Sequence, residues 1–213
     1  MVVTCLEVGP LMANCYVVGC EATQRGFVVD PGGEAERIAE AVAAAGLQID
    51  LILDTHCHPD HIAANCALRE ALGAAQDSSP RLLVHPADRA AVEKPPMQWL
   101  LIGLRPAPCP VDGTFAEGDE LTVGDLRVRV MHLPGHSPGS VAFVLGEALF
   151  TGDTLFAGGI GRTDLPGGNG KQMRASLKRL VAELPASTLV YPGHGPSSTI
   201  GEERDTNEWL AGM

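Results

Sequence analysis

The heptapeptide Thr55–His61, with the sequence THCHPDH, is the feature that most restricts what this chain can fold into. It carries three histidines and one aspartate directly after the apolar run Leu51–Leu53. Imidazole is the commonest side-chain ligand of transition metals, and loops seldom hold it at this density. In an extended segment His56 and His58 leave the same side of the backbone, so both can reach one cation. The motif therefore predicts a metal site at the end of a strand.

The second half of the motif predicts a second cation near the first. Asp60 and His61 follow a proline, which is common in the first turn of a helix, so both should project from a helix start. The helix dipole favours a carboxylate there. Cys57 alternates with the two histidines and should point away from the metal. Asp54 and Thr55 are expected either to fix imidazole tautomers or to cap the strand end.

Three later loops can supply the further ligands that a dinuclear site needs. The turns PGHSPG and PGHGP each present a histidine, His136 and His194, after an apolar run. Asp153 follows a third apolar run, and a carboxylate can bridge two cations with its two oxygens. Gly152 beside it would let the backbone approach closely. The sequence thus predicts ligands from four separate loops.

In this order and at these separations, the motifs THCHPDH, PGHSPG, TGDT and PGHG resemble those of the metallo-β-lactamase superfamily of metallo-hydrolases. The resemblance spans nearly the whole chain and is closest to the glyoxalase II-like branch, the hydroxyacylglutathione hydrolases. It implies an α+β fold, an αββα sandwich of two mixed β-sheets face to face with helices on the outer faces, formed by residues 1–213 as one domain. It also implies that the first metal is held by His56, His58 and His136, and the second by Asp60, His61 and His194, with Asp153 bridging both.

Two divalent cations that share a water lower its pKa from ~15.7 towards roughly 7. The resemblance therefore implies a hydrolase, in which a metal-bridging hydroxide attacks the carbonyl of a small acyl-thiol or ester. Asp60 would be the catalytic residue that orients the hydroxide and passes its proton to the leaving group. Imidazole and carboxylate donors without a thiolate suit zinc, iron and manganese, of which zinc is expected.

Other functions on the same scaffold stay open. A persulfide dioxygenase-like oxidoreductase with a single iron would share the THCH-x-DH motif and the GRTD-containing loop, but such enzymes depart from PGHG at the last motif. A lactonase is a second alternative, and a metal-stabilised binding protein without activity is a third. The complete set of seven ligands favours the dinuclear hydrolase.

Two loops are candidates for shaping substrate choice. In the loop 158–164, Arg162 stands where glyoxalase II enzymes typically have a lysine that helps bind glutathione, so it is a candidate substrate-binding residue. Asp164 stands where those enzymes have a tyrosine, and the longer helical domain that completes their glutathione site is not expected after His194, so whether glutathione is recognised stays open. The proline-rich loop 94–115 is either a wall of the cleft or packing over the core edge.

Charge and composition restrict the partners. The net charge is −11 and the 15 lysines and arginines are scattered, so no nucleic-acid partner is expected. The chain has neither a secretory signal nor an apolar run of membrane-spanning length, which predicts a cytoplasmic protein without membrane contact. Its six cysteines form no C-x-x-C pair and should be reduced thiols. His85 and His132 are expected outside the site, and the oligomeric state stays open.

Apolar periodicity by itself indicates only mixed α and β structure. It predicts strands at 2–8, 15–18, 26–29, 51–53, 82–84, 120–123, 126–133, 141–145, 148–151 and 188–191, and helices near 38–45, 64–72, 173–184 and within 201–213.

Overall fold

Two six-stranded sheets form the centre of the computed structural model, which describes residues 1–97, 99, 104 and 106–210. The first sheet has the order β1-β2-β3-β4-β5-β6, with β1 to β3 antiparallel and β3 to β6 parallel. It is therefore mixed, as predicted. Its strands are β1 (Val2–Val8), β2 (Ala13–Gly19), β3 (Arg25–Val29), β4 (Gln48–Leu53), β5 (Arg81–Val84) and β6 (Gly113–Thr114).

The second sheet has the order β14-β13-β10-β9-β8-β7 and is also mixed. Its pairs are antiparallel except for β10 with β13, which run parallel. The strands are β7 (Glu120–Val123), β8 (Leu126–His132), β9 (Val141–Leu145), β10 (Ala148–Gly152), β13 (Leu189–Pro192) and β14 (Ser198–Thr199). A small separate hairpin joins β11 (Leu155–Phe156) to β12 (Gly159–Ile160).

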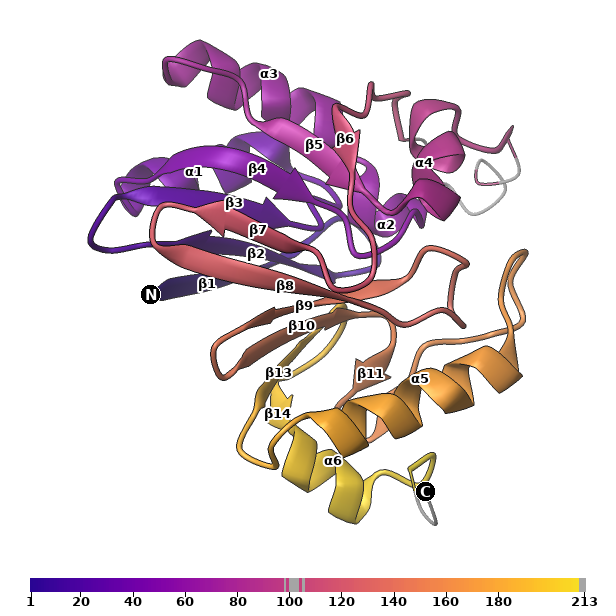
Figure 1. Cartoon of the computed structure of the whole chain (residues 1–213). Coiled ribbons are helices and arrows are strands. Elements are labelled where there is room, and N and C mark those ends of the chain that lie inside the picture. Colours follow the sequence, from indigo (N-terminus) through magenta and orange to yellow (C-terminus); the bar gives the residue numbers. More distant parts are fainter. Residues whose placement is uncertain (98, 100–103, 105, 211–213) are drawn as a thin grey trace.

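Helices cover the outer faces of both sheets (Figure 1). On the first sheet lie α1 (Ala35–Ala44) and α3 (Asn65–Ala75), and on the second lie α5 (Gly170–Glu183) and α6 (Ile200–Thr206). The short helices α2 (Pro59–Ile62) and α4 (Pro86–Glu93) sit at one end of the first sheet. This arrangement confirms the predicted αββα sandwich.

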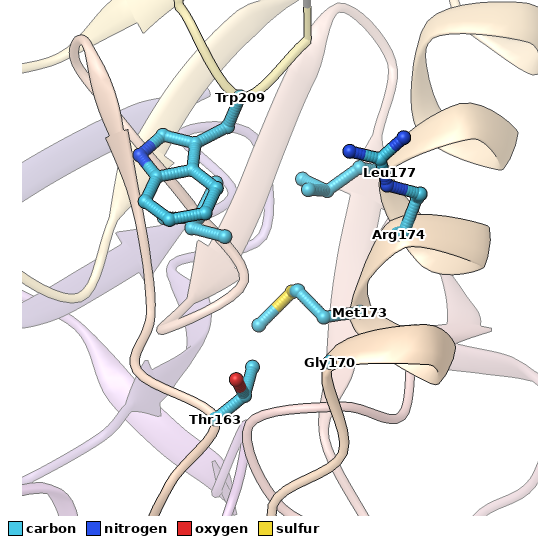
Figure 2. A pocket seen from close by; sticks show the side chains of 7 residues that line it. Thr163, Gly170, Met173, Arg174, Leu177 and Trp209 are labelled. Atoms are coloured by element: carbon cyan, nitrogen blue, oxygen red, sulfur yellow. The ribbon is translucent and has the colours of Figure 1, made fainter.

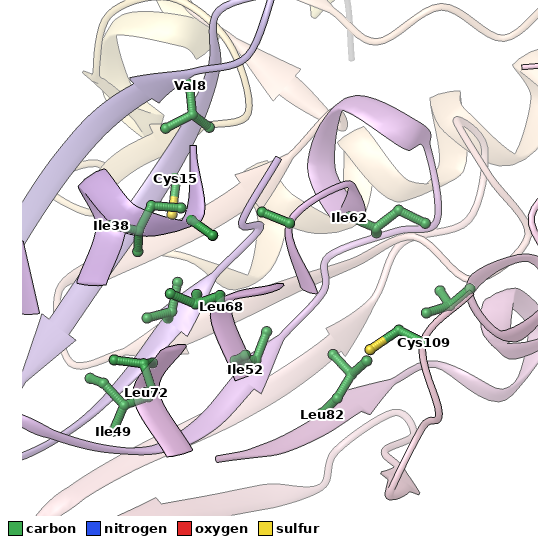
Figure 3. Close-up of a cluster of buried hydrophobic side chains, with 14 of the residues drawn as sticks. Val8, Cys15, Ile38, Ile49, Ile52, Ile62, Leu68, Leu72, Leu82 and Cys109 are labelled. Carbon is green, nitrogen blue, oxygen red and sulfur yellow. The ribbon is translucent and has the colours of Figure 1, made fainter. Parts of the chain in front are cut away.

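Three apolar layers hold the sandwich together. Ile38 of α1 and Leu68 of α3 pack with Ile52 of β4 under the first sheet (Figure 3). The middle layer lies between the sheets and includes Phe27, Phe143 and Phe150, and the third layer lies under α5 and α6. Strand β2 is buried along its whole length because Cys15 and Val17 face the helices while Tyr16 and Val18 face the other sheet. Each fully buried large apolar side chain stabilises the fold by roughly 1.5–3 kcal/mol.

The predicted elements are present with shifts of a few residues at their ends, and α6 is the helix expected within 201–213, of which 211–213 lie outside the described residues. Helix α4 and the two-residue strands were not predicted. In the loop 94–115, residues 98, 100–103 and 105 lie outside the described residues. Its described part packs on the core: Cys109, Val111 and Phe115 are buried. Within the described residues, no helix combines the length and the apolar character that crossing a bilayer requires.

Candidate metal centre

The seven predicted metal ligands lie beyond strand ends at one edge of the sandwich, five of them in loops and two, Asp60 and His61, in the short helix α2. His56 and His58 come after β4, His136 after β8, Asp153 directly after β10, and His194 after β13. Backbone hydrogen bonds tie these loops together. Thr55 accepts from Val141 N–H at 2.9 Å across the two sheets, and Gly193 N–H donates to the Gly152 carbonyl at 2.8 Å. The fold therefore brings together residues that are up to 138 positions apart, from 56 to 194.

The first group is formed by His56, His58 and His136, whose candidate ligand atoms all lie within 4.8 Å of one another. All three side chains are buried, and Nδ1 of His58 faces Nε2 of His136 at 2.6 Å. Burial, followed by the neighbouring imidazoles, lowers the pKa of His56 well below its usual range and that of His58 to about 3. Burial also lowers the pKa of His136. Neutral imidazoles at neutral pH offer lone pairs to a cation.

The second group consists of Asp60, His61 and His194 and is equally compact. Oδ2 of Asp60 lies 3.2 Å from Nε2 of His194 and 3.6 Å from Nε2 of His61. Burial raises the pKa of Asp60, but the hydrogen bond with His194 and the charge of His61 outweigh it, so the pKa is held well below its usual range. His194 is the most exposed of the three, at 27% of its side chain, so the site opens to solvent on this side.

Asp153 lies between the two groups. Its Oδ1 atom is 3.3 Å from Nε2 of His61, and its Oδ2 atom is 3.4 Å from Nε2 of His136 and 3.9 Å from Nε2 of His194. Oδ1 thus faces the second group and Oδ2 lies nearest the first, so the carboxylate is placed to bridge two cations. Gly152 is essential for this approach because a Cβ there would lie 2.2 Å from Oγ1 of Thr55.

The other ring nitrogen of three histidines is held by the protein, which fixes the tautomer. Thr55 donates its hydroxyl to Asp30 at 2.6 Å, so Nδ1 of His56 must donate to the Thr55 oxygen at 3.0 Å. Nδ1 of His61 donates to Asp30 at 3.1 Å, and Nδ1 of His136 donates to the carbonyl of Arg162 at 2.8 Å. In each ring Nε2 is therefore the nitrogen that faces the site, and it can bind a cation in its deprotonated form.

Three atoms in this centre have no protein partner. Among the described residues, Nε2 of His56, Nε2 of His61 and Oδ1 of Asp153 are buried without a hydrogen bond. A buried polar atom without a partner costs about 1–3 kcal/mol, and a coordinated cation would satisfy all three. Their donor chemistry, imidazole nitrogen and carboxylate oxygen, suits divalent transition metals. The residues present therefore fit a metal centre, and their role as ligands stays a prediction.

The structure also places the other residues that were singled out in the sequence. Thr55 fixes an imidazole tautomer as expected, whereas Asp54 accepts a hydrogen bond from Asn65 at 2.7 Å and makes none to an imidazole of the described residues. Cys57 is buried and belongs to none of the candidate metal groups of the described residues, in line with its predicted orientation. The guanidinium of Arg162 is exposed and pairs with Asp164 at 2.8 Å. All six cysteines are free thiols.

The two histidines predicted to lie outside the site are indeed in none of the candidate metal groups of the described chain. The rings of His85 and His132 stack with centroids 4.2 Å apart. Nδ1 of His85 accepts the N–H of Ala87 at 3.2 Å and caps α4, while Nε2 of His132 contacts the carbonyl of Pro138 at 2.9 Å.

Two buried carboxylates were missed by sequence reasoning. Asp30 accepts from Thr55 and His61, and Asp88 accepts from the backbone of Cys57. Asp30 has a left-handed backbone, with φ of 52°, which a non-glycine residue adopts at a cost of about 1–3 kcal/mol and chiefly at functional sites. The signal in the sequence was its position, directly after an apolar strand and before Pro31.

A separate cavity of about 90 Å³ lies between the N-terminal part of α5, β12 and Trp209 (Figure 2). Met173 and Leu177 form its apolar side, with Arg174 at the edge and Thr163 opposite. None of the seven predicted site residues lines it.

Comparison with known proteins agrees with this geometry. The profile of the metallo-beta-lactamase superfamily matches residues 8–194. A probable metallo-hydrolase, YqgX, of Bacillus subtilis is 35% identical over 98% of this chain and 97% of its own. The hydroxyacylglutathione hydrolase GloC of Haemophilus influenzae is 33% identical over 96% of this chain and 97% of its own.

Solved structures are similar over the full length. The B3 metallo-beta-lactamase BLEG-1 superposes with a TM-score of 0.89 and 36% identity, covering 99% of this chain and 100% of its own. TTHA1623 in a di-iron-bound form gives a TM-score of 0.83 and 39% identity, covering 97% of this chain and 100% of its own. ETHE1 from Myxococcus xanthus gives a TM-score of 0.82 and 32% identity, covering 100% of this chain and 85% of its own.

Proposed function

This chain belongs to the metallo-beta-lactamase superfamily, and from that premise we propose that it is a dinuclear metal-dependent hydrolase that cleaves a small acyl-thioester or ester. One observation carries the proposal. Two compact groups, His56-His58-His136 and Asp60-His61-His194, stand on either side of Asp153, whose Oδ1 faces His61 and whose Oδ2 lies nearest His136. No predicted ligand of either group is missing, which favours two cations over one.

Two bound divalent cations would supply Lewis acidity for the carbonyl and lower the pKa of a water towards roughly 7. Zinc is the ion we expect, and the di-iron form of TTHA1623 makes iron the first alternative, with manganese the second. His56, His58 and His136 would hold the first ion, Asp60, His61 and His194 the second, and Asp153 both.

Asp60 is the residue to which we assign proton transfer. Its carboxylate is only 14% exposed, and a carboxylate is ionised at neutral pH and can accept a proton. It can therefore take a proton from the attacking water and deliver it to the departing sulfur or oxygen. The balanced reaction consumes one water and yields a carboxylic acid and a thiol or alcohol.

Arg162 is the residue to which we assign contact with an anionic part of the substrate. Its side chain is 61% exposed, and its backbone carbonyl accepts from Nδ1 of His136, so the loop that carries Arg162 contacts the first group. The name of the relative GloC supports an acyl-thiol as the substrate class. The net charge of −11 supports a small molecule rather than a nucleic acid, and the cytoplasm is the compartment we expect.

A substrate panel tests this proposal against its rivals. The metal-loaded protein would be given a set of small acyl-thioesters, a lactone, a β-lactam and a glutathione persulfide with oxygen. We expect hydrolysis of a thioester that stops on chelation. Oxygen uptake with the persulfide and one iron per chain would support the mono-iron oxidoreductase instead, and turnover of the lactone alone would support a lactonase. The panel includes a β-lactam because the similar structure BLEG-1 is a B3 metallo-beta-lactamase.

A further inference from the structure

Asp88, on helix α4, connects two loops that carry predicted ligands of the first metal. Asp88 is buried, with only 3% of the residue exposed. Its Oδ2 atom accepts from the backbone N–H of Cys57 at 3.0 Å and from the hydroxyl of Ser137 at 2.6 Å. Its Oδ1 atom accepts from the backbone N–H of Gly139 at 2.9 Å. Cys57 stands between His56 and His58, so one carboxylate holds both the first loop and the loop around His136.

The fit between Asp88 and Gly139 is steric as well as polar. A Cβ at Gly139 would lie 2.5 Å from Cγ and 2.7 Å from Oδ1 of Asp88, closer than atoms can stand. The backbone of Gly139 is not in the left-handed region, so the requirement for glycine comes from the carboxylate alone. The second glycine of the PGHSPG turn thus leaves room for an acidic side chain from another helix.

Asp88 and Asp30 support different sets of predicted ligands. Asp88 bonds to the loops of His58 and His136, whose ring nitrogens face each other at 2.6 Å. Asp30 bonds to His61 of the second group and, through Thr55, to His56 of the first. No hydrogen bond joins Asp88 to Asp60, His61 or His194 among the interactions of the described residues. Loss of Asp88 should therefore affect the two ions unequally.

We propose that Asp88 is a positioning residue that sets the spacing of the His58 and His136 loops and thereby the affinity for the first metal. The inference rests on the dinuclear centre of the proposed function. Groups that orient metal ligands typically contribute 10–100-fold to metal affinity. We expect Asp88→Asn to lower the affinity for the first ion by roughly that factor and to leave the second ion bound with wild-type affinity.

Metal-free protein titrated with Zn²⁺ in a calorimeter, and with Co²⁺ in a visible absorption spectrum, tests the proposal without any substrate. Asn has nearly the same size as Asp, but its NH₂ group must face one of the three donors, so one hydrogen bond becomes a repulsive contact. After dialysis Asp88→Asn should retain one ion. That ion should be lost when His194→Ala is added and kept when His136→Ala is added.

Asp112→Asn is the matched control. Its carboxylate also accepts a backbone N–H, from Leu82 at 2.8 Å, and pairs with Arg69 at 2.8 Å, but contacts no predicted ligand. It should bind both ions as the wild type does. Ser137→Ala removes one of the three hydrogen bonds to Asp88 and should weaken the first ion by a smaller factor. If Asp88→Asn does not fold, the loss of first-ion affinity in Ser137→Ala tests the proposal instead.

Two results would overturn the proposal: a folded Asp88→Asn protein that binds both ions with wild-type affinity, or one that loses both ions equally. A wild-type chain that binds two ions but cleaves no substrate of the panel would contradict the proposed function and leave this inference standing.

Discussion

Asp153 presents its Oδ1 atom to Nε2 of His61 at 3.3 Å, in a buried position where neither atom has a hydrogen-bond partner among the described residues. Without a cation these atoms keep lone pairs that nothing satisfies, unless the imidazole is protonated. Burial would lower the pKa of His61, but the negative charge of Asp153, followed by the hydrogen bond and charge of Asp30, raises it well above its usual range. The proton then occupies the place that a divalent cation would take.

Asp60→Asn should separate proton transfer from metal binding. The amide keeps an oxygen that can still bind the second ion, but it cannot accept a proton at neutral pH. We expect kcat for a thioester to fall by about 10²–10⁴ while KM changes little. Steady-state kinetics and metal analysis on the same sample give both quantities. An active Asp60→Asn enzyme with two bound ions would exclude Asp60 as the proton carrier.

Asp30→Asn should weaken the second ion. Asn adopts the left-handed backbone as readily as Asp, so the φ of 52° adds no strain to the variant. The variant loses the carboxylate that accepts from both Thr55 and Nδ1 of His61, and a loss of about 10–100-fold in affinity follows. Zn²⁺ titration measures it. Asp50→Asn, which removes a half-exposed pair with Arg25, is the control and should leave metal affinity unchanged.

Gly32→Ala should disrupt the start of α2, because a Cβ at Gly32 would lie 1.7 Å from the carbonyl oxygen of Asp60. The backbone that carries Asp60 and His61 must shift, and we expect a loss of about 1–3 kcal/mol in the free energy of unfolding. Denaturant unfolding checks this value. Gly46→Ala is the control: its Cβ meets nothing within 4 Å, so only its left-handed φ of 65° contributes, about 1 kcal/mol. Equal losses in both variants would contradict the steric account.

His85→Asn should make the fold less sensitive to acid. Burial, followed by charge repulsion from the neighbouring His132, lowers the pKa of His85 in the folded state below the unfolded value of about 6.5. The unfolded chain therefore binds more protons at acid pH, so the stability contributed by neutral His85 is fully present above about pH 6.5 and is lost as the pH falls through the folded pKa. Protonation also removes the acceptor that caps α4.

Asn caps helices without titrating, so the stability difference between wild type and variant should shift in favour of the variant on acidification, by at most ~1 kcal/mol. Denaturant unfolding of the metal-free proteins near pH 7.5 and near pH 5.5 measures it, because all other histidines are common to both. A difference that does not change with pH would refute the role of His85.

Arg162→Ala should raise KM for an anionic acyl-thiol by roughly 2- to 5-fold, the effect of one exposed charge, and leave kcat almost unchanged. Arg162→Lys keeps the charge and should restore most of the affinity. The comparison uses initial rates with one anionic and one neutral thioester. The same increase in KM for both substrates would mean that Arg162 acts through the His136 loop and not through its charge.

The seven predicted metal ligands could be found in the sequence because each lies in a short motif that contains glycine or proline. His56, His58 and His61 cluster within six positions, and glycine or proline flanks His136, Asp153 and His194. The predicted convergence of the four loops is confirmed by the two compact groups around Asp153. Their role as ligands and the single-domain organisation stay predictions.

The supporting residues could not be found in the same way, because their partners are 25 to 51 positions away and are partly backbone atoms. Asp88 meets the N–H groups of Cys57 and Gly139, and the carbonyl of Arg162 meets His136. A backbone donor or acceptor leaves no trace in the residue types of a sequence. These contacts depend on the packing of the two sheets, which only the structure provides.

Helix α4 was missed for a different reason. Of its eight residues only Asp88 and Val92 are buried, so no apolar repeat at helical spacing exists to predict it. Its start is nevertheless defined locally, by Pro86 in the first turn and by the cap from His85. The one buried acidic residue on this helix is the one that contacts the metal loops.

The most direct test of the account is the metal content of the purified, metal-replete protein, measured together with thioester hydrolysis during chelation and reloading. The account predicts two divalent ions per chain, loss of hydrolysis in step with loss of metal, and recovery when metal is restored. Thioester hydrolysis that persists in protein stripped of metal, or a replete chain that holds fewer than two ions, would contradict it.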